Sequence, residues 1–187
     1  RIEYSSIYSN TAQAIGGIAS GYGGAILDIT NSTLAGNRAD YLASTLLVAG
    51  GNLFDNNAGF GPDALTLRNV TIAGNDKLDG SISAADFSAF VNTDIGGKTA
   101  TVAITNTIIA SGANERSCFT GVLAIGSVPA TTSNLDNDGT CGSNFRQSDA
   151  ILFGPFGVYG QAISPAQVEA GASFTLTVPL FPLMPGS

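Results

Sequence analysis

One stretch of sequence, which occurs three times, decides the fold. Its three copies are AILDITNSTLAGN at residues 25–37, DALTLRNVTIAGN at residues 63–75 and ATVAITNTIIASG at residues 100–112. The copies align without gaps, and two apolar positions recur in each: Leu27, Leu65 and Val102 at the first, and Ile29, Leu67 and Ile104 at the second. Repetition at steps of 38 and 37 residues indicates stacked structural units, with these two positions forming the core stacks.

Two weaker copies of the second half of the repeat lie at residues 6–12 and 51–58. They indicate that alternate copies are degraded, so the predicted period is about half of the 38-residue step. A period of about 20 residues is at the short end for solenoid repeats.

Each copy alternates apolar and polar residues before it reaches Asn and Gly, which predicts short strands that end in tight corners. A shared asparagine follows the apolar pair, at Asn31, Asn69 and Asn106. Asn tolerates a left-handed backbone, and its amide can hydrogen-bond to the next Asn along a stack, so we expect a corner ladder. Residues 83–91 are the best candidate for a helix, and that segment is short.

These features predict an all-β parallel β-helix, with a β-sandwich as the alternative. The coils are expected at residues 1–112 and a C-terminal cap at residues 113–187. Because a terminal coil is an open sheet edge, the cap is expected to cover it, with Phe174–Val178 as a probable terminal strand.

The composition narrows the functional classes. Hydrophobic residues make up 44% of the 187 residues and charged residues only 11%, which disfavours both disorder and a helical bundle. Seven basic residues against 14 acidic ones give a net charge of −7, so nucleic acid is not an expected partner. The absence of histidine excludes imidazole-based nucleophilic catalysis and histidine-ligated zinc.

Two cysteines, Cys118 and Cys141, lie 23 positions apart in this acidic chain, which favours one disulfide over a metal site. A disulfide predicts an oxidising compartment, so we expect an extracellular or cell-surface location. No apolar run reaches the roughly 18 residues of a membrane-spanning helix, so no transmembrane segment is expected.

The repeats resemble those of bacterial right-handed parallel β-helix surface proteins. This resemblance rests on GGAI at residues 23–26, on ITNSTLAGN at residues 29–37 and on a closing segment that includes residues 106–110, 133–142 and 153–157. The group comprises pectate-lyase-like and polymorphic-outer-membrane-protein-like chains, often with a choice-of-anchor C-terminus. The resemblance implies a right-handed coil and an exported protein. It implies no defined activity, because the fold hosts lyases, hydrolases, adhesins and inert stalks.

Candidate catalytic residues are sparse. By the same resemblance, a lyase would hold calcium with carboxylates and use Arg or Lys as the base. Asp28 and Arg68 are outward-facing charges on the repeats, but Thr66 and Ala103 occupy the other positions of the Asp28 column. Glycoside hydrolysis needs two neighbouring carboxylates, and the three Glu residues all lie outside the repeats. We therefore predict no catalytic residue.

One motif has the spacing of a calcium loop. Asp136 and Asp138 stand at alternate positions before a Gly, and oxygen ligands in that pattern suit calcium. Gln147 stands at the position where such a loop carries a bidentate Glu. The sequence therefore leaves two interpretations open, a calcium site and a plain turn.

The sequence favours a non-catalytic extracellular structural protein that presents a rigid rod. The alternative is a polysaccharide lyase or hydrolase, or a glycan-binding module, on the same scaffold. Arg1 opens directly into patterned sequence, so upstream coils or another protein subunit are expected to cover that end. Surface glycans are a further candidate partner, through tyrosines that cluster in the first quarter of the chain: Tyr4, Tyr8, Tyr22 and Tyr41.

Overall fold

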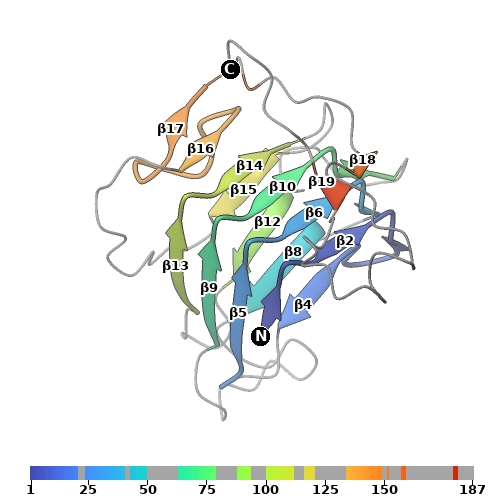
Figure 1. Cartoon of the computed structure of the whole chain (residues 1–187), viewed down its shortest axis with the longest axis horizontal. Coiled ribbons are helices and arrows are strands. Elements are labelled where there is room, and N and C mark those ends of the chain that lie inside the picture. Colours follow the sequence, from blue (N-terminus) through green and yellow to red (C-terminus); the bar gives the residue numbers. More distant parts are fainter. Residues whose placement is uncertain are drawn as a thin grey trace, which may run out of the picture.

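The computed structural model consists of β-strands, most of which pair in parallel (Figure 1). It describes residues 1–20, 24–40, 43–49, 63–78, 88–93, 100–111, 116–120, 134–148, 151, 157–158 and 179–180. Within these ranges every regular secondary-structure element is a strand. The chain is therefore all-β with parallel sheets, as the repeat predicts.

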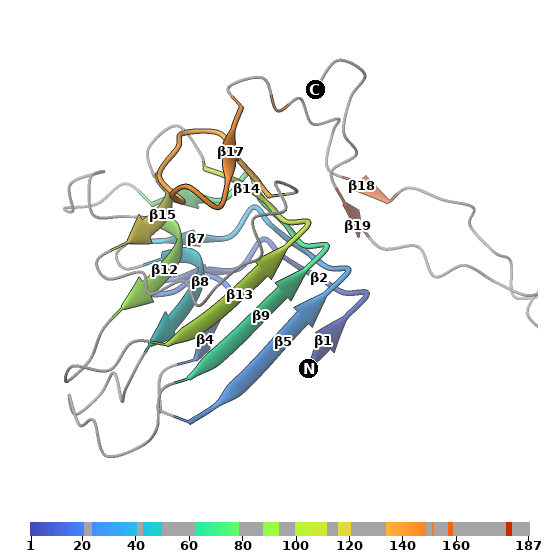
Figure 2. The same cartoon turned by 90° about the vertical axis from the view of Figure 1, so that its left-hand side faces the viewer.

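Two parallel sheets, here called A and D, carry the longer strands. Sheet A has the spatial order β1 (Ile2–Glu3), β5 (Ile26–Thr30), β9 (Ala64–Arg68) and β13 (Thr101–Thr105), side by side in Figure 2. Sheet D has the order β4 (Ile18–Ser20), β8 (Ala43–Ala49), β12 (Ser88–Thr93) and β15 (Arg116–Thr120).

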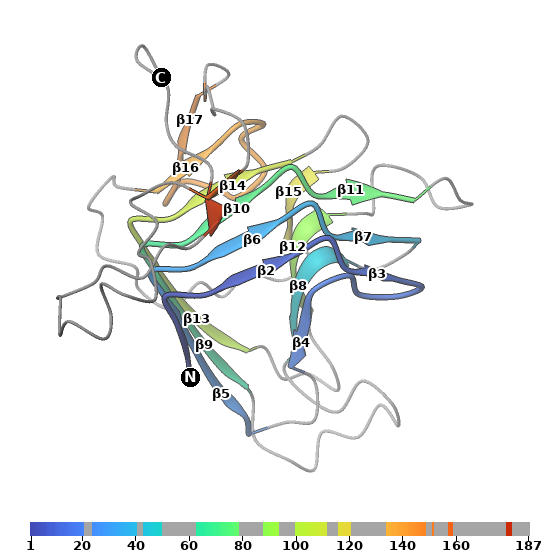
Figure 3. The same cartoon turned by 45° about the vertical axis from the view of Figure 1, so that its right-hand side comes forward.

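Sheets B and C connect sheet A to sheet D along the chain (Figure 3). Sheet B has the order β2 (Ser6–Tyr8), β6 (Thr33–Ala35), β10 (Thr71–Ala73), β14 (Ile108–Ala110), β16 (Leu135–Asp136) and β17 (Arg146–Gln147). Sheet C has the order β3 (Thr11–Ala12), β7 (Arg38–Ala39) and β11 (Asp76–Lys77). A separate antiparallel pair consists of β18 (Gly157–Val158) and β19 (Pro179–Leu180).

Each sheet receives one strand from each successive unit of the chain. The first unit is β1 to β4, the second β5 to β8 and the third β9 to β12, and each visits sheets A, B, C and D in that order. In sheet A, Ile2 lies opposite Ile29, Ile29 opposite Leu67, and Leu67 opposite Ile104. Equivalent residues of successive units are therefore immediate neighbours, 27, 38 and 37 positions apart.

The predicted period of about 20 residues is wrong. Leu27 and Leu65 pair directly across β5 and β9, so no further strand lies between the two copies. The step is long because one unit contains four strands and four corners. The weak copy at residues 6–12 is equivalent to the second half of the repeat, since Ser6 pairs with Thr33 and Ile7 with Leu34. The other weak copy, at residues 51–58, lies outside the described residues.

The C-terminal part differs from the expectation in two respects. Parallel pairing continues past residue 112, because β15 pairs with β12 and β16 pairs with β14. Residues 88–93 form strand β12, so the helix expected at 83–91 is wrong for the part that is described. The terminal strand expected at Phe174–Val178 lies outside the described residues.

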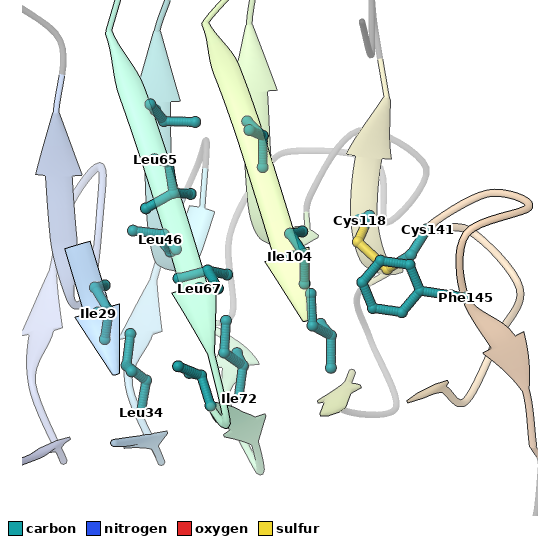
Figure 4. Close-up of a cluster of buried hydrophobic side chains, with 14 of the residues drawn as sticks. Ile29, Leu34, Leu46, Leu65, Leu67, Ile72, Ile104, Cys118, Cys141 and Phe145 are labelled. Atoms are coloured by element: carbon teal, nitrogen blue, oxygen red, sulfur yellow. A yellow bond between two sulfur atoms is a disulfide. The ribbon is translucent and has the colours of Figure 1, made fainter. Parts of the chain in front are cut away.

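Alternate side chains of sheet A point into the core. Ile29, Leu67 and Ile104 pair in register and are at most 1% exposed. They form a continuous stack across three strands (Figure 4). Burying one aliphatic side chain stabilises a fold by about 1.5–3 kcal/mol, so such a stack is a principal source of stability.

The second inward stack is buried at two of its three expected positions. Leu65 and Val102 are buried, whereas Leu27 is only partly buried against the core. Strand β1 begins at Ile2, which lies opposite Ile29, so no β1 residue lies beside Leu27. The remaining core side chains come from sheets B and D and include Leu34, Ile72, Ile109, Leu46 and Val48.

The three repeat copies turn from sheet A into sheet B at an asparagine in the left-handed backbone region, and the first unit turns there at Tyr4, with a φ angle of 47°. The φ angle is 49° at Asn31, 54° at Asn69 and 50° at Asn106, and Asn enters this region more readily than most residues. The side chain of Asn69 donates from Nδ2 to Asn31 Oδ1 at 2.8 Å, and Asn106 Nδ2 donates to Asn69 Oδ1 at 3.1 Å. The three amides form a ladder along the stacking direction.

A second asparagine ladder, buried this time, follows sheet B. The Nδ2 of Asn10 donates to Asn37 Oδ1 at 2.9 Å, and that of Asn37 donates to Asn75 Oδ1 at 3.2 Å. The backbone N–H of Asn37 also donates to Asn75 Oδ1, at 2.8 Å. Asn37 and Asn75 are 0% exposed, so these bonds satisfy polar groups that burial would otherwise penalise.

Replacing Leu67 with Ala tests the core register. Leu67 is 0% exposed, so we expect the substitution to lower the free energy of unfolding by about 2–5 kcal/mol, measured by denaturant titration. Ile26 on β5 is the matched control, because it is an aliphatic residue of the same sheet that is 83% exposed. Ile26→Ala should change the free energy by no more than about 0.5 kcal/mol. Equal costs for the two variants would refute the inward assignment.

Two substitutions of Asn69 separate backbone strain from the ladder bonds. Asn69→Gly keeps access to the left-handed region and loses the amide, whereas Asn69→Ala loses both. We expect Asn69→Ala to be the more destabilising, by about 1 kcal/mol relative to Asn69→Gly, because Ala pays the left-handed backbone cost. Thermal unfolding of the two variants measures the difference. A more stable Ala variant would show that the corner is not left-handed in solution.

Candidate functional site

The outer face of sheet A carries the charged residues that the sequence singles out. Arg68 lies in register with Thr30 and Thr105, and Asp28 lies in register with Thr66 and Ala103. Asp28 and Arg68 are therefore diagonal neighbours on adjacent strands. The Asp28 column contains no second carboxylate on these three strands.

Asp28 is the centre of a small charge cluster. Its Oδ2 accepts a hydrogen bond from Arg68 Nη2 at 3.3 Å and lies 3.7 Å from Arg1 Nε. Its Oδ1 accepts a bond from the Thr30 hydroxyl at 3.3 Å. Arg1 also pairs with Glu3. The Arg68 and Arg1 side chains are more than half exposed, so each ion pair stabilises the fold by at most about 1 kcal/mol.

This cluster has little capacity for lyase or hydrolase chemistry. Calcium-assisted elimination needs several carboxylates that converge on one ion and an unpaired base. Here one carboxylate is shared by two guanidinium groups, and the guanidinium of Arg68 is bonded to it.

The acidic turn after β16 is the second candidate site. Asp136 is 1% exposed, and its Oδ2 accepts the backbone N–H of Cys141 at 2.9 Å. Its Oδ1 is buried and has no hydrogen-bond partner among the described residues. Gln147, at the twelfth position of the supposed calcium loop, lies opposite Asp136 in the pairing of β16 with β17.

Asp138 connects this turn to the last strand of sheet D. Its Oδ2 accepts the backbone N–H of Ser117 at 3.0 Å, and its Oδ1 accepts both the N–H and the hydroxyl of Thr140, at 3.1 and 2.8 Å. The Thr140 hydroxyl oxygen in turn accepts the N–H of Cys118 at 3.0 Å. Two backbone donors of β15 are therefore satisfied by side chains of the turn, which closes the edge of the sheet.

The fold shifts the pKa values of the two carboxyl groups in opposite directions. Burial raises the pKa of Asp136 above its usual value, and the charge of Asp138 adds to this effect, although the N–H of Cys141 opposes it. Burial also favours a higher pKa for Asp138, but the donors of Ser117 and Thr140 together lower that pKa below its usual value. Asp138 is therefore stabilised as the anion that these donors require.

In the structure, the residues of the calcium-like motif form a hydrogen-bonded turn. Three protein donors occupy the oxygens of Asp138, and Asp136 is buried. Among the described residues, no group of three or more Asp, Glu, Cys or His side chains could hold a metal ion.

The predicted disulfide between Cys118 and Cys141 is present. It joins strand β15 to the end of the acidic turn, and both cysteines are at most 3% exposed. Phe145 belongs to the same hydrophobic cluster and lies beside the bond in Figure 4. The disulfide, Phe145 and the side chains of the turn together cover the C-terminal end of the core.

Sequence reasoning missed several polar residues that position these elements. Asp63 is 0% exposed; its Oδ2 accepts the Ser20 hydroxyl at 2.6 Å, and its Oδ1 accepts the N–H of Ala25 at 2.9 Å. It connects the end of sheet D in one unit to the start of sheet A in the next. Asn37 and Asn75 occupy the same last position of the first two repeat copies. This recurrence is the sequence signal that could have predicted their ladder.

Comparisons with known proteins leave the chain without an assigned relative. A scan against protein-family models, a search of curated proteins and a search of solved structures each found no match. In the part of the chain that is described, no helix is long and apolar enough to cross a membrane.

Chemical tests of the disulfide have a definite expectation. Thiol titration of the unreduced, denatured protein should find no free thiol, because Cys118 and Cys141 are bonded to each other. Reduction should lower the free energy of unfolding by roughly 3 kcal/mol, the value that the chain-entropy model gives for a loop of this length. A Cys118→Ala, Cys141→Ala double variant should match the reduced protein. Two reactive thiols in the native chain would contradict the bond.

Stability should depend on pH in opposite ways through the two acidic residues. Asp138 has a lowered pKa in the folded state, so its contribution is present above about pH 3.9 and is lost as the pH falls through its folded pKa. Asp136 has a raised pKa, so stability falls as the pH rises from about 3.9 through its folded pKa.

Denaturant titrations between pH 2 and 7 separate the two effects. Asp138→Asn should remove part of the acid-induced loss of stability, and Asp136→Asn should remove part of the loss on raising the pH. Identical pH profiles for the wild type and both variants would show that neither carboxyl changes its pKa on folding.

Proposed function

We propose that this chain is a non-catalytic extracellular scaffold built as a right-handed parallel β-helix. One observation carries the proposal: the polar side chains best placed for chemistry are occupied in holding one unit to the next. Asp138 binds the N–H of Ser117 and Asn69 binds its two ladder neighbours, while Asp28 is shared between Arg1 and Arg68.

The β-helix assignment is supported by the order in which the chain visits its sheets. Successive units enter sheets A, B, C and D in the same order and pair in parallel with the unit before. A connection between parallel neighbours in one sheet is right-handed in about 98% of cases, because of the twist of the strands. That preference supports the right-handed coil.

An extracellular location is the second part of the proposal. A disulfide is compatible with an oxidising compartment, and reducing compartments rarely preserve one. The acidic chain, with 14 acidic residues against seven basic ones, suits a surface that does not bind polyanions. A rigid stack of this kind acts through its shape, because it can hold other protein parts at a distance or present them.

The proposal is tested by a polysaccharide screen. Acidic and neutral polysaccharides, each with and without calcium, should show neither turnover nor saturable binding, because Asp28 and Arg68 are paired with each other. Calcium or a chelator should leave the midpoint of thermal unfolding unchanged, because protein donors already occupy the oxygens of Asp138.

Variants make the screen specific. Reproducible turnover that disappears in Arg68→Ala and survives in Thr101→Ala would overturn the scaffold and favour a carbohydrate-active enzyme. Thr101 is the matched control because it is an exposed residue of the same sheet that belongs to neither candidate site. Saturable glycan binding lost in Tyr4→Ala would instead favour a glycan-binding module.

A further inference from the structure

Two kinds of link join the turn at residues 136–141 to strand β15. The covalent link is the disulfide drawn in Figure 4. The noncovalent links lie beside it in the sequence. Asp138 Oδ2 accepts the N–H of Ser117. The Thr140 hydroxyl oxygen accepts the N–H of Cys118. Since these hydrogen bonds use no sulfur atom, they can hold the turn against β15 whether or not the sulfurs are bonded.

The carboxylate of Asp138 stabilises the docked turn. It accepts the N–H of Ser117 at 3.0 Å, and the N–H and hydroxyl of Thr140 at 3.1 and 2.8 Å. Hydrogen bonds to an ionised acceptor are roughly twice as strong as bonds between neutral groups. The three donors use both carboxylate oxygens, so an amide at this position would leave at least one donor without an acceptor.

Asp136 acts in the opposite direction. It lies in register with Ile109, and Ile109 with Ile72, so its carboxyl group continues an apolar stack of sheet B. The residue is 1% exposed, and its Oδ1 has no hydrogen-bond partner among the described residues. Moving an incompletely paired carboxyl group out of water costs free energy. Asp136 therefore favours the undocked turn, in which it is hydrated.

Docking also brings the two cysteines together. The Cα atoms of Cys118 and Cys141 are 4.9 Å apart, within the range that a disulfide requires. Docking and bond formation are linked equilibria, so a side chain that favours the docked turn raises the tendency of the cysteines to bond by the same factor. The state of the sulfurs and the state of the turn are therefore coupled.

We propose that the turn at residues 136–141 is a redox-sensitive closure. While the cysteines are thiols, Asp138 and Thr140 dock the turn on β15 and Asp136 opposes docking, so the turn opens and closes. Oxidation by a disulfide-containing oxidant locks the docked state. This switch goes beyond the scaffold function and does not depend on it.

The oxidation step is a thiol–disulfide exchange. The thiols of Cys118 and Cys141 give two electrons and two protons to the disulfide of the oxidant, which becomes two thiols, while the bond between the two cysteines forms. Once formed, this bond holds Asp136 in its buried position against the cost of its burial. An oxidising compartment thus converts a reversible contact into a permanent one.

Equilibrium between the protein and dithiothreitol measures the coupling. Dithiothreitol gives two electrons and two protons to the disulfide and closes to its own cyclic disulfide, so the ratio of oxidised to reduced protein gives an effective concentration of the cysteine thiols. At neutral pH, Asp138→Asn should lower that concentration by about tenfold or more, because a charged acceptor is lost. Asp136→Asn should raise it by about threefold or more, because a neutral amide costs less to bury.

Asp76→Asn is the matched control. Asp76 lies on β11 of sheet C, and its Oδ1 accepts the N–H of Lys77 at 2.8 Å, so this substitution makes the same chemical change in a different sheet. It should leave the effective concentration unchanged. Because both test variants replace Asp by Asn, a nonspecific loss of stability would lower the effective concentration in both. Shifts of the two in the same direction, or no shift in Asp138→Asn, would overturn the redox-sensitive closure.

Hydrogen exchange tests whether the turn docks without a disulfide. In the Cys118→Ala, Cys141→Ala double variant, the amides of residues 117 and 118 should remain protected by Asp138 and Thr140. Adding Asp138→Asn should accelerate their exchange by about tenfold or more. If these amides exchange as fast in the double variant as in the triple variant, the disulfide alone holds the turn and the closure is refuted.

Discussion

The left-handed corner at Asn31, Asn69 and Asn106 is the constraint on which the rest of the structure depends. A chain that turns at the same point in every unit brings equivalent residues into register. Register in turn decides whether Ile29, Leu67 and Ile104 form one stack or are turned outward, because a slip of one residue reverses every side chain of a strand. The amide ladder stabilises the aligned state, because its hydrogen bonds form only when the corners of successive units are in register.

Polar groups in this molecule serve mainly to connect units. Asn37 and Asn75 satisfy backbone groups inside the stack, Asp63 fixes the passage from sheet D to sheet A, and Asp138 closes the last strand of sheet D. On sheet A, Asp28 forms ion pairs with both Arg1 and Arg68. This use of the polar side chains is the observation on which the proposed scaffold function rests.

The repeat predicts the core stacks and the corner ladder, because each depends on a residue type that recurs at one position, and the two isolated cysteines predict the disulfide. The steps of 38 and 37 residues between the copies are the spacings of the stacked units, and the halved period was wrong because the weak copy at residues 6–12 belongs to a first unit only 27 residues from the next. Asp136 and Asp138 were ambiguous for another reason. The same spacing of carboxylates suits a calcium loop and a turn that binds backbone N–H groups, and the sequence does not show that Ser117 and Thr140 donate to Asp138.

The unequal steps between units have a consequence for how such a chain can diversify. From Ser20 to Ile29 is nine residues, whereas the equivalent passage from Val48 to Leu67 is nineteen, yet both pairs of residues lie in register. Insertions at this passage therefore leave the pairing unchanged, because closing a longer connection costs only a fraction of a kcal/mol for each doubling of its length. Insertions in the connection from sheet D to sheet A can therefore add surface residues, while the residues of the core stay under the same selection.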